Sequence, residues 1–171
     1  DLQSEQWEII FRQLEQSQSQ FLAREAIMTS KREWYQRCGF ASLDDLQTFR
    51  WKDVFEMLGG IQSDFLSHEK QFRSPAYKWP RDPLHFVARP WEYAYVFSHL
   101  KDWQDSHPEI DVPKIMDFGS GVTFFPFAAA RHRMEVTAVD VDLVVQNDFL
   151  KATQVVSALP GSVQFSLSRQ D

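Results

Sequence analysis

The chain has 171 residues, which is enough for one modest domain or for a small domain with a helical extension. Its net charge of -6 at pH 7 argues against a nucleic-acid partner, because proteins that hold a phosphate backbone usually carry a basic face. A single cysteine, Cys38, excludes an intrachain disulfide and a multi-cysteine metal site, and a lone thiol suits a reducing cytoplasm. The lack of a signal peptide and of an apolar run near ~18 residues predicts no membrane span.

Residues 1 to about 37 predict one or two helices, because apolar residues recur there at helical spacing. The stripe continues through the Gln/Ser-rich stretch 13–20, which is therefore typical of a solvated helix face rather than of a linker. Its members are Trp7, Ile10, Phe11, Leu14 and Phe21.

A capping box begins the next predicted helix. Ser42 is its N-cap, and Asp45 takes the place of the usual Glu three residues later. We expect this helix to run to about Leu58, where Gly59-Gly60 supplies residue types that end helices in a left-handed conformation. A further short helix is expected over residues 61–72.

Repeated prolines mark an irregular segment from Arg73 to Pro90, because proline breaks helices and removes donors from strand ladders. We expect an ordered crossing segment there, with His85 as the histidine placed to line a substrate pocket. Three other histidines are expected to be structural or exposed, and no cluster of ligands predicts a metal site; they are His68, His107 and His132. A helix is expected from Trp91 to about Trp103.

After Pro113 the pattern alternates between strands and helices, which predicts an α/β fold with a parallel, doubly wound sheet. Pro126 is tolerated in its helix because it falls in the first turn. The expected order is a strand at 115–116, a helix at 124–132, a strand at 136–139, a helix at 143–159 and a strand from 163 to 167 that leads to Asp171.

A glycine turn, residues 117–123, joins the first of these strands to its helix. Glycines let the backbone approach a ligand closely, and ligands of open α/β sheets bind beyond the carboxyl ends of the strands. A dinucleotide fingerprint would have a third glycine where this chain has Phe124. Asp117 would also repel a pyrophosphate, whereas its carboxylate suits a ligand that carries an ammonium group and a sulfonium.

The turn resembles motif I of class I S-adenosylmethionine-dependent methyltransferases, an acid followed by glycines at alternate positions. Asp117, Gly119 and Gly121 match this motif, and Thr123 stands in place of its third glycine. The resemblance implies a Rossmann-like fold in which Asp117 and Phe118 lie at the methionine part of the cofactor. Gly119 and Gly121 would let the backbone curve beneath it.

The resemblance also assigns residues on the following strands. Asp140 would bind the ribose hydroxyls, with Asp142 as the neighbouring alternative, and Val141 would flank the adenine. Asp171 would accept a hydrogen bond from the adenine amino group. The other interpretation is that Asp140 and Asp142 only cap a loop.

Upstream of the first strand, Arg89 could pair with the methionine carboxylate, because a guanidinium matches a carboxylate as a fork. Trp91 or Tyr93 could pack near the sulfonium. The alternative is an ordinary surface arginine with aromatic residues of the core.

The resemblance covers residues 88–171, the N-terminal half of a Rossmann-like cofactor domain, and leaves residues 1–87 as a helical extension or cap. A complete domain of this family has a seven-stranded sheet, so three strands imply a truncated or incomplete chain, or a second chain that completes the sheet. An open sheet edge is rarely left exposed.

The function implied by the resemblance is methyl transfer from S-adenosylmethionine to a small-molecule acceptor. The general base and the catalytic residues are not identified by the sequence. The alternative is a non-catalytic, methyltransferase-like interaction module, as a homo-oligomer or a partner subunit. A nicotinamide-binding dehydrogenase is disfavoured by Asp117 and Phe124.

Overall fold

The computed structural model describes residue 36, residues 42–86 and residues 89–168. The chain divides into two units, residues 1–39 and 40–171, and the fold below is that of the second unit. The helices predicted over residues 1–37, as well as Cys38 and Asp171, lie outside the described residues. In the described part of the chain, no helix is both long enough and apolar enough to cross a membrane.

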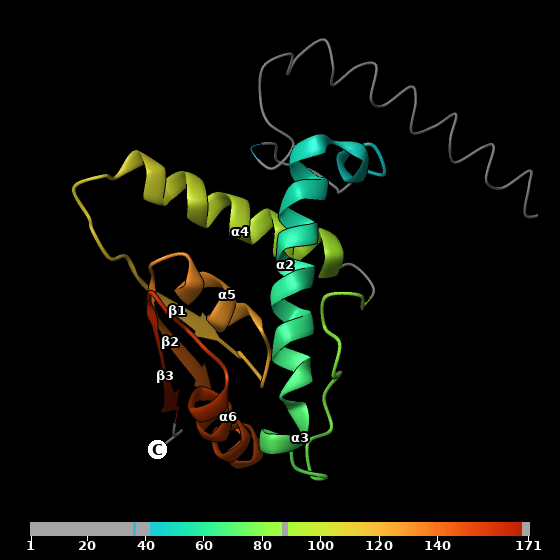
Figure 1. The fold of residues 1–171 in the computed structure, drawn as a ribbon, viewed down its shortest axis with the longest axis vertical. Coiled ribbons are helices and arrows are strands. Elements are labelled where there is room, and N and C mark those ends of the chain that lie inside the picture. The colour runs from blue at the N-terminus through green and yellow to red at the C-terminus, as the bar shows by residue number, and fades with distance from the viewer. Residues whose placement is uncertain (1–35, 37–41, 87–88, 169–171) are drawn as a thin grey trace, which may run out of the picture. The chain divides into compact units, whose positions relative to one another are not determined.

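A three-stranded parallel sheet lies at one side of this unit (Figure 1). Its strands β1 (Lys114–Phe118), β2 (Glu135–Asp140) and β3 (Ser162–Leu167) lie side by side in chain order. Helix α5 (Phe125–Arg131) connects β1 to β2, and helix α6 (Leu143–Val155) connects β2 to β3. The predicted α/β class and the parallel strand order are confirmed.

One face of the sheet is covered by helices. Ile115, Val136 and Val163 are lateral neighbours in the strand register and pack beneath α5 together with Ala129 and Ala130. Both crossover helices pack on this face, since α5 contacts β2 and β3 and α6 contacts β3.

The opposite face is exposed. Met116 and Phe118 on β1 are 57% and 74% exposed, and the same face carries an ion pair of 3.4 Å between Lys114 Nζ and Glu135 Oε2. The second helical layer of a doubly wound sheet is therefore absent from residues 42–86 and 89–168.

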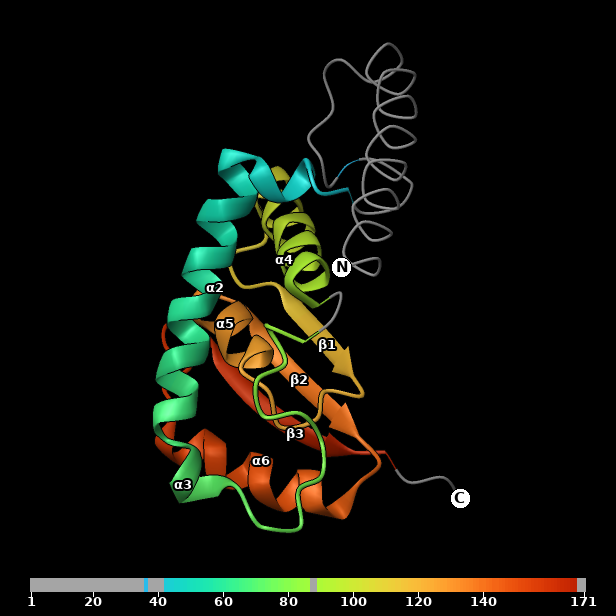
Figure 2. The ribbon, with the colours of Figure 1, turned by 90° about the vertical axis from the view of Figure 1, so that its right-hand side faces the viewer.

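Phenylalanine rings connect the elements through the core. The ring of Phe65 lies 5.4 Å from that of Phe127, which lies 5.7 Å from Phe149, and Phe149 lies 5.2 Å from Phe165. These rings belong in turn to α2 (Phe49–Ser67), α5, α6 and β3. Helix α2 thus shares one aromatic core with the sheet and its crossover helices. Figure 2 shows α2 passing beside α5.

The predicted capping box is present but starts a different element. Ser42 N donates to Asp45 Oδ2 at 2.9 Å, and Asp45 N donates to Ser42 Oγ at 3.2 Å. These bonds begin the 3-10 helix η2 (Asp45–Gln47), and Thr48 then serves as the N-cap of α2 by accepting from Trp51 N at 3.2 Å.

The predicted helix end at Gly59-Gly60 is wrong, because α2 continues to Ser67. Neither glycine adopts a positive φ. Leu58 and Phe65, one on each side of the pair, both bury their side chains in the core, and that packing holds the helix through two poor helix formers. The separate helix expected over residues 61–72 is reduced to α3 (Glu69–Phe72).

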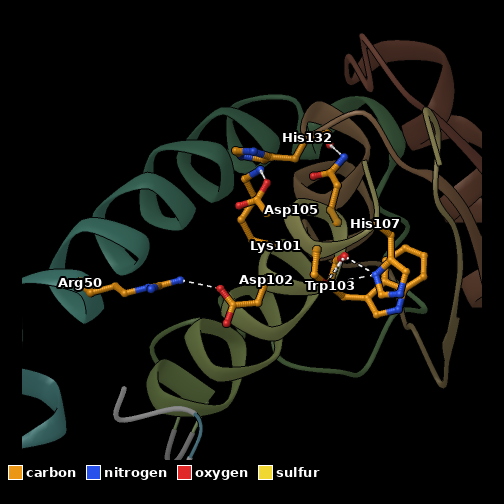
Figure 3. Close-up of polar contacts among 9 residues, drawn as sticks. Arg50, Lys101, Asp102, Trp103, Asp105, His107 and His132 are labelled. Carbon is orange, nitrogen blue, oxygen red and sulfur yellow. Dashed lines mark hydrogen bonds and ion pairs between the residues drawn. The ribbon is translucent and has the colours of Figure 1, made fainter. Parts of the chain in front are cut away.

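Helix α4 (Arg89–Ser106) is longer than predicted at both ends, with Pro90 in its first turn. Figure 3 shows how its C-terminal half is anchored. Arg50 Nη2 of α2 donates to Asp102 Oδ1 at 2.9 Å, and Gln104 Nε2 donates to the His132 carbonyl after α5 at 3.1 Å.

Helix α6 ends at Val155 rather than at the predicted Leu159. Val156 is extended, with φ -100° and ψ 127°, and its side chain is buried in the core. The chain then passes directly against other backbone, where Gly161 N donates to the Ala130 carbonyl at 2.9 Å. Core burial and this close passage end the helix before proline does.

Two glycine substitutions test these helix boundaries. Gly60→Ala should stabilise the fold by about 0.5–1 kcal/mol, because the added methyl meets no atom within 4 Å and alanine is the better helix former. Gly161→Ala should cost about 1–3 kcal/mol or more, because its Cβ would lie 2.2 Å from the Met134 carbonyl oxygen. Urea unfolding measures both. A destabilised Gly60→Ala protein would contradict a continuous α2.

Candidate functional site

The turn after β1 requires its glycines. Gly119 has φ 68° and Gly121 has φ 55°, in the left-handed region where a side chain is strained. Gly119 N and Ser120 N both donate to the Val139 carbonyl, at 2.8 and 3.2 Å. The chain therefore folds back across the carboxyl end of β2 before α5 begins.

Asp140 closes this turn. Its Oδ2 accepts from Gly121 N at 3.0 Å, and its Oδ1 accepts from Val141 N at 2.7 Å and from Asp142 N at 3.1 Å. The carboxylate thus connects the end of β2 to the glycine turn. A carboxylate offers about four lone-pair sites, so one further acceptor site remains after these three bonds.

Asp142 has a different position from Asp140. It is the N-cap of α6, and its Oδ1 accepts from Val144 N at 2.7 Å. Of the two acids, only Asp140 lines the cavity described next, whereas Val141 between them has a 66% exposed side chain that lines no cavity found at the turn.

A cavity of about 580 Å³ lies over the turn. Gly119, Ser120, Gly121 and Asp140 line it on the side of the sheet. The crossing segment, residues 73–86, supplies an aromatic and proline-rich wall opposite, which consists of Tyr77, Trp79, Pro80, Pro83 and Phe86. This volume is in the range of small-molecule sites.

A second cavity of about 200 Å³ adjoins the first and is lined by Asp117 and Phe118 among others. The two cavities have five lining residues in common, which are Arg89, Tyr93, Gly119, Ser120 and Thr123. A ligand that reached from Asp140 to Asp117 would pass along these shared residues.

Asp117 is half-buried and has no hydrogen-bond partner for its carboxyl among the described residues. Burial raises the pKa of its carboxyl from 3.8 to about 6, Arg89 opposes that rise and the charge of Asp140 adds to it. No residue in 42–86 or 89–168 donates a hydrogen bond to this carboxyl. Beside it, burial raises the pKa of the Tyr93 hydroxyl to about 12, so this ring stays neutral.

Arg89, on the first turn of α4, faces both cavities. Its Nε lies 3.3 Å from Glu92 Oε2, and its guanidinium carbon lies 5.9 Å from the centre of the Tyr93 ring. Trp91, the other aromatic considered for this position, instead stacks on Tyr95 with ring centres 4.6 Å apart. The structure therefore brings Arg89 and Tyr93, but not Trp91, to the glycine turn.

His85, expected to line a substrate pocket, lines neither of the two cavities at the turn. Its Nδ1 lies 2.9 Å from Asp82 Oδ1, and its ring meets Phe55 edge-on at 5.6 Å, outside the cavity lining. The other histidines hold local structure. His68 and His107 contact carbonyl oxygens of their own helices, while His132 meets the Phe97 ring at 4.8 Å and burial lowers its pKa.

Sequence reasoning missed Arg73 and Tyr77. Tyr77 Oη accepts a hydrogen bond from Val122 N at 3.1 Å, and Arg73 Nη2 donates to the Val122 carbonyl at 3.2 Å. The partners are 45 and 49 residues apart in the chain, so no local pattern could reveal the pairing. The only sequence signal was the aromatic content of the crossing segment.

No group of three or more His, Cys, Asp or Glu side chains in the described ranges is arranged to hold a metal ion. Comparison of the chain with family models, with curated proteins and with solved structures finds no match.

The Asp117 carboxyl should make stability depend on pH. Its pKa is about 6 in the folded protein against an ordinary 3.8, so the folded state holds this proton more tightly and loses stability as pH rises from about 4 to 6. Asp117→Asn removes that loss. The change that this substitution makes in the free energy of unfolding should therefore be more stabilising at pH 7 than at pH 4, by on the order of 2 kcal/mol. A carboxyl titration midpoint near 4, measured by carbon NMR, would contradict this.

Proposed function

We propose that this chain binds S-adenosylmethionine at the glycine turn and is the cofactor-binding part of a class I methyltransferase with a small-molecule acceptor. The observation that carries the proposal is the pair of unlike carboxylates, Asp117 and Asp140, on the two sides of one left-handed glycine turn. The parallel order of β1, β2 and β3 supports a Rossmann-like sheet.

Asp117 fits the ammonium end of such a cofactor. A buried carboxylate without a hydrogen-bond donor costs free energy, and a cation with N–H donors removes that cost. A pyrophosphate at the same place would add a second buried anion. The residue therefore favours an amino-acid-bearing cofactor over a dinucleotide.

Asp140 fits the ribose. Its bonds to three backbone amides fix the carboxylate and still leave it one acceptor site for a hydroxyl. Because the carboxylate is already fixed, less conformational entropy is lost when a ligand binds. Arg89 supplies a guanidinium for the cofactor carboxylate, and the neutral ring of Tyr93 supplies a surface for the sulfonium.

The cofactor would supply a methyl group on sulfur that a nucleophile displaces, with the electron pair of the broken carbon–sulfur bond returning to sulfur. This chain's contribution is to hold the donor in one orientation at the turn, because in-line approach provides most of the rate for a leaving group that is already good. A base is required only for an acceptor that carries a proton.

Isothermal titration of the chain with S-adenosylmethionine tests the proposal. We expect saturable 1:1 binding that Asp117→Asn weakens about 10- to 100-fold, because a charge-assisted hydrogen bond is lost. Asp142→Asn is the matched control, since asparagine keeps the N-cap while the same charge is removed from the adjacent turn. NAD should give no heat. Preferential binding of NAD, or no binding of S-adenosylmethionine by a folded chain, would overturn the proposal.

A second candidate is a methyltransferase-like interaction module. It is favoured by the exposed face of β1, where Met116 and Phe118 lie on a strand that pairs on one side only among the described residues. Light scattering distinguishes the two candidates. A stable dimer without cofactor affinity would favour the module, and a cofactor-binding monomer would exclude it.

A further inference from the structure

Val122, the residue directly after Gly121, has both of its backbone polar groups held by the crossing segment. Its N–H donates to Tyr77 Oη at 3.1 Å and its carbonyl accepts from Arg73 Nη2 at 3.2 Å. Val122 is almost completely buried, so water cannot replace either partner. Loss of a partner would leave a buried polar group unsatisfied.

The two side chains that hold Val122 also hold each other. The Arg73 guanidinium carbon lies 4.1 Å from the centre of the Tyr77 ring, and the Arg73 side chain is only 2% exposed. Arg73 Nε donates to Glu69 Oε1 at 2.7 Å. This cluster of Glu69, Arg73, Tyr77 and Val122 is called the Val122 brace below.

The crossing segment that carries the brace is itself fixed to the helical layer. Ser74 N donates to Asp148 Oδ2 of α6 at 2.8 Å, and Leu84 N donates to Gln62 Oε1 of α2 at 3.0 Å. The segment is thus tied on both sides of Tyr77. The position of the turn therefore depends on α2 and α6 through this segment, as well as on the sheet.

The Tyr77 hydroxyl still has a proton to donate. A phenol oxygen carries one proton and two acceptor lone pairs. The Val122 N–H donates to one of these lone pairs, which leaves the proton of the Tyr77 hydroxyl available. None of the residues described in the structure accepts a hydrogen bond from Tyr77. The side chain lines the larger cavity, and its oxygen lies so close to the turn that a Cβ on Gly121 would be 3.2 Å away.

We propose that Tyr77 is a positioning residue that couples the crossing segment to the glycine turn and donates its hydroxyl proton to the ligand bound there. The ligand would present an oxygen or nitrogen acceptor beside Gly121. Only the identity of that ligand as S-adenosylmethionine rests on the proposed function. The contact between Tyr77 and Val122 exists without it and is tested separately.

Tyr77→Phe separates the two roles, because the ring beneath Arg73 is kept and only the hydroxyl is removed. In the ligand-free protein, amide exchange at Val122 measured by NMR should become about tenfold faster, since its acceptor is lost. The affinity for S-adenosylmethionine should fall about three- to tenfold. Tyr95→Phe is the matched control, because Tyr95 lies on α4 and lines neither cavity.

Arg73→Lys provides a second variant that keeps the positive charge near Glu69 and loses the planar fork to Val122. It should also accelerate exchange at Val122 while circular dichroism shows an intact fold. Unchanged exchange in both variants would overturn the brace. Faster exchange with unchanged affinity would overturn the donation to the ligand. Faster exchange in a chain that binds no S-adenosylmethionine would support the brace and refute the proposed cofactor.

Discussion

The turn after β1 has four consecutive backbone amides whose hydrogen-bond acceptors lie outside the turn. Gly119 N and Ser120 N use the Val139 carbonyl, Gly121 N uses the Asp140 carboxylate, and Val122 N uses the Tyr77 hydroxyl. An unpaired buried amide costs about 1–3 kcal/mol, so the acceptors of the two buried residues, Ser120 and Val122, stabilise the turn most. The acceptors come from β2 and from the crossing segment, and the turn therefore forms only when both are in place.

The same requirement separates the chemistry of the two aspartates. The Asp140 carboxylate accepts hydrogen bonds from three backbone amides, which fix its orientation. Asp117, near the end of β1, receives no such bond from the described residues, and partial burial raises the pKa of its carboxyl to about 6. The turn thus presents two different carboxyl groups. Asp140 is an acceptor of fixed orientation, and the Asp117 carboxylate would be stabilised by a bound cation. That asymmetry, more than the glycines, favours a cofactor with an ammonium group.

The fold around the turn is one-sided. An aromatic row from Phe65 on α2 to Phe165 on β3 holds the helices on one face of the sheet. The other face exposes Met116 and Phe118 beside polar partners such as Thr137 and Gln164, which are joined by a hydrogen bond of 2.8 Å. The core of this unit is complete on the side that supports the site, because the crossing segment, α4 and α5 all pack there.

The sequence alone determined the local features. Alternating apolar residues predicted β2 and β3, and the reciprocal hydrogen bonds predicted between Ser42 and Asp45 are formed, although Thr48 caps α2. The glycines predicted to form the turn at 119 and 121 adopt positive φ, which only glycine does at low cost. Tertiary structure decided the rest. Burial of Leu58 and Phe65 carried α2 through Gly59-Gly60, burial of Val156 ended α6 early, and Tyr77 reached Val122 across 45 residues of chain. Periodicity and capping act within a few residues, whereas the free energy of core burial and of buried hydrogen bonds depends on partners that the fold brings together.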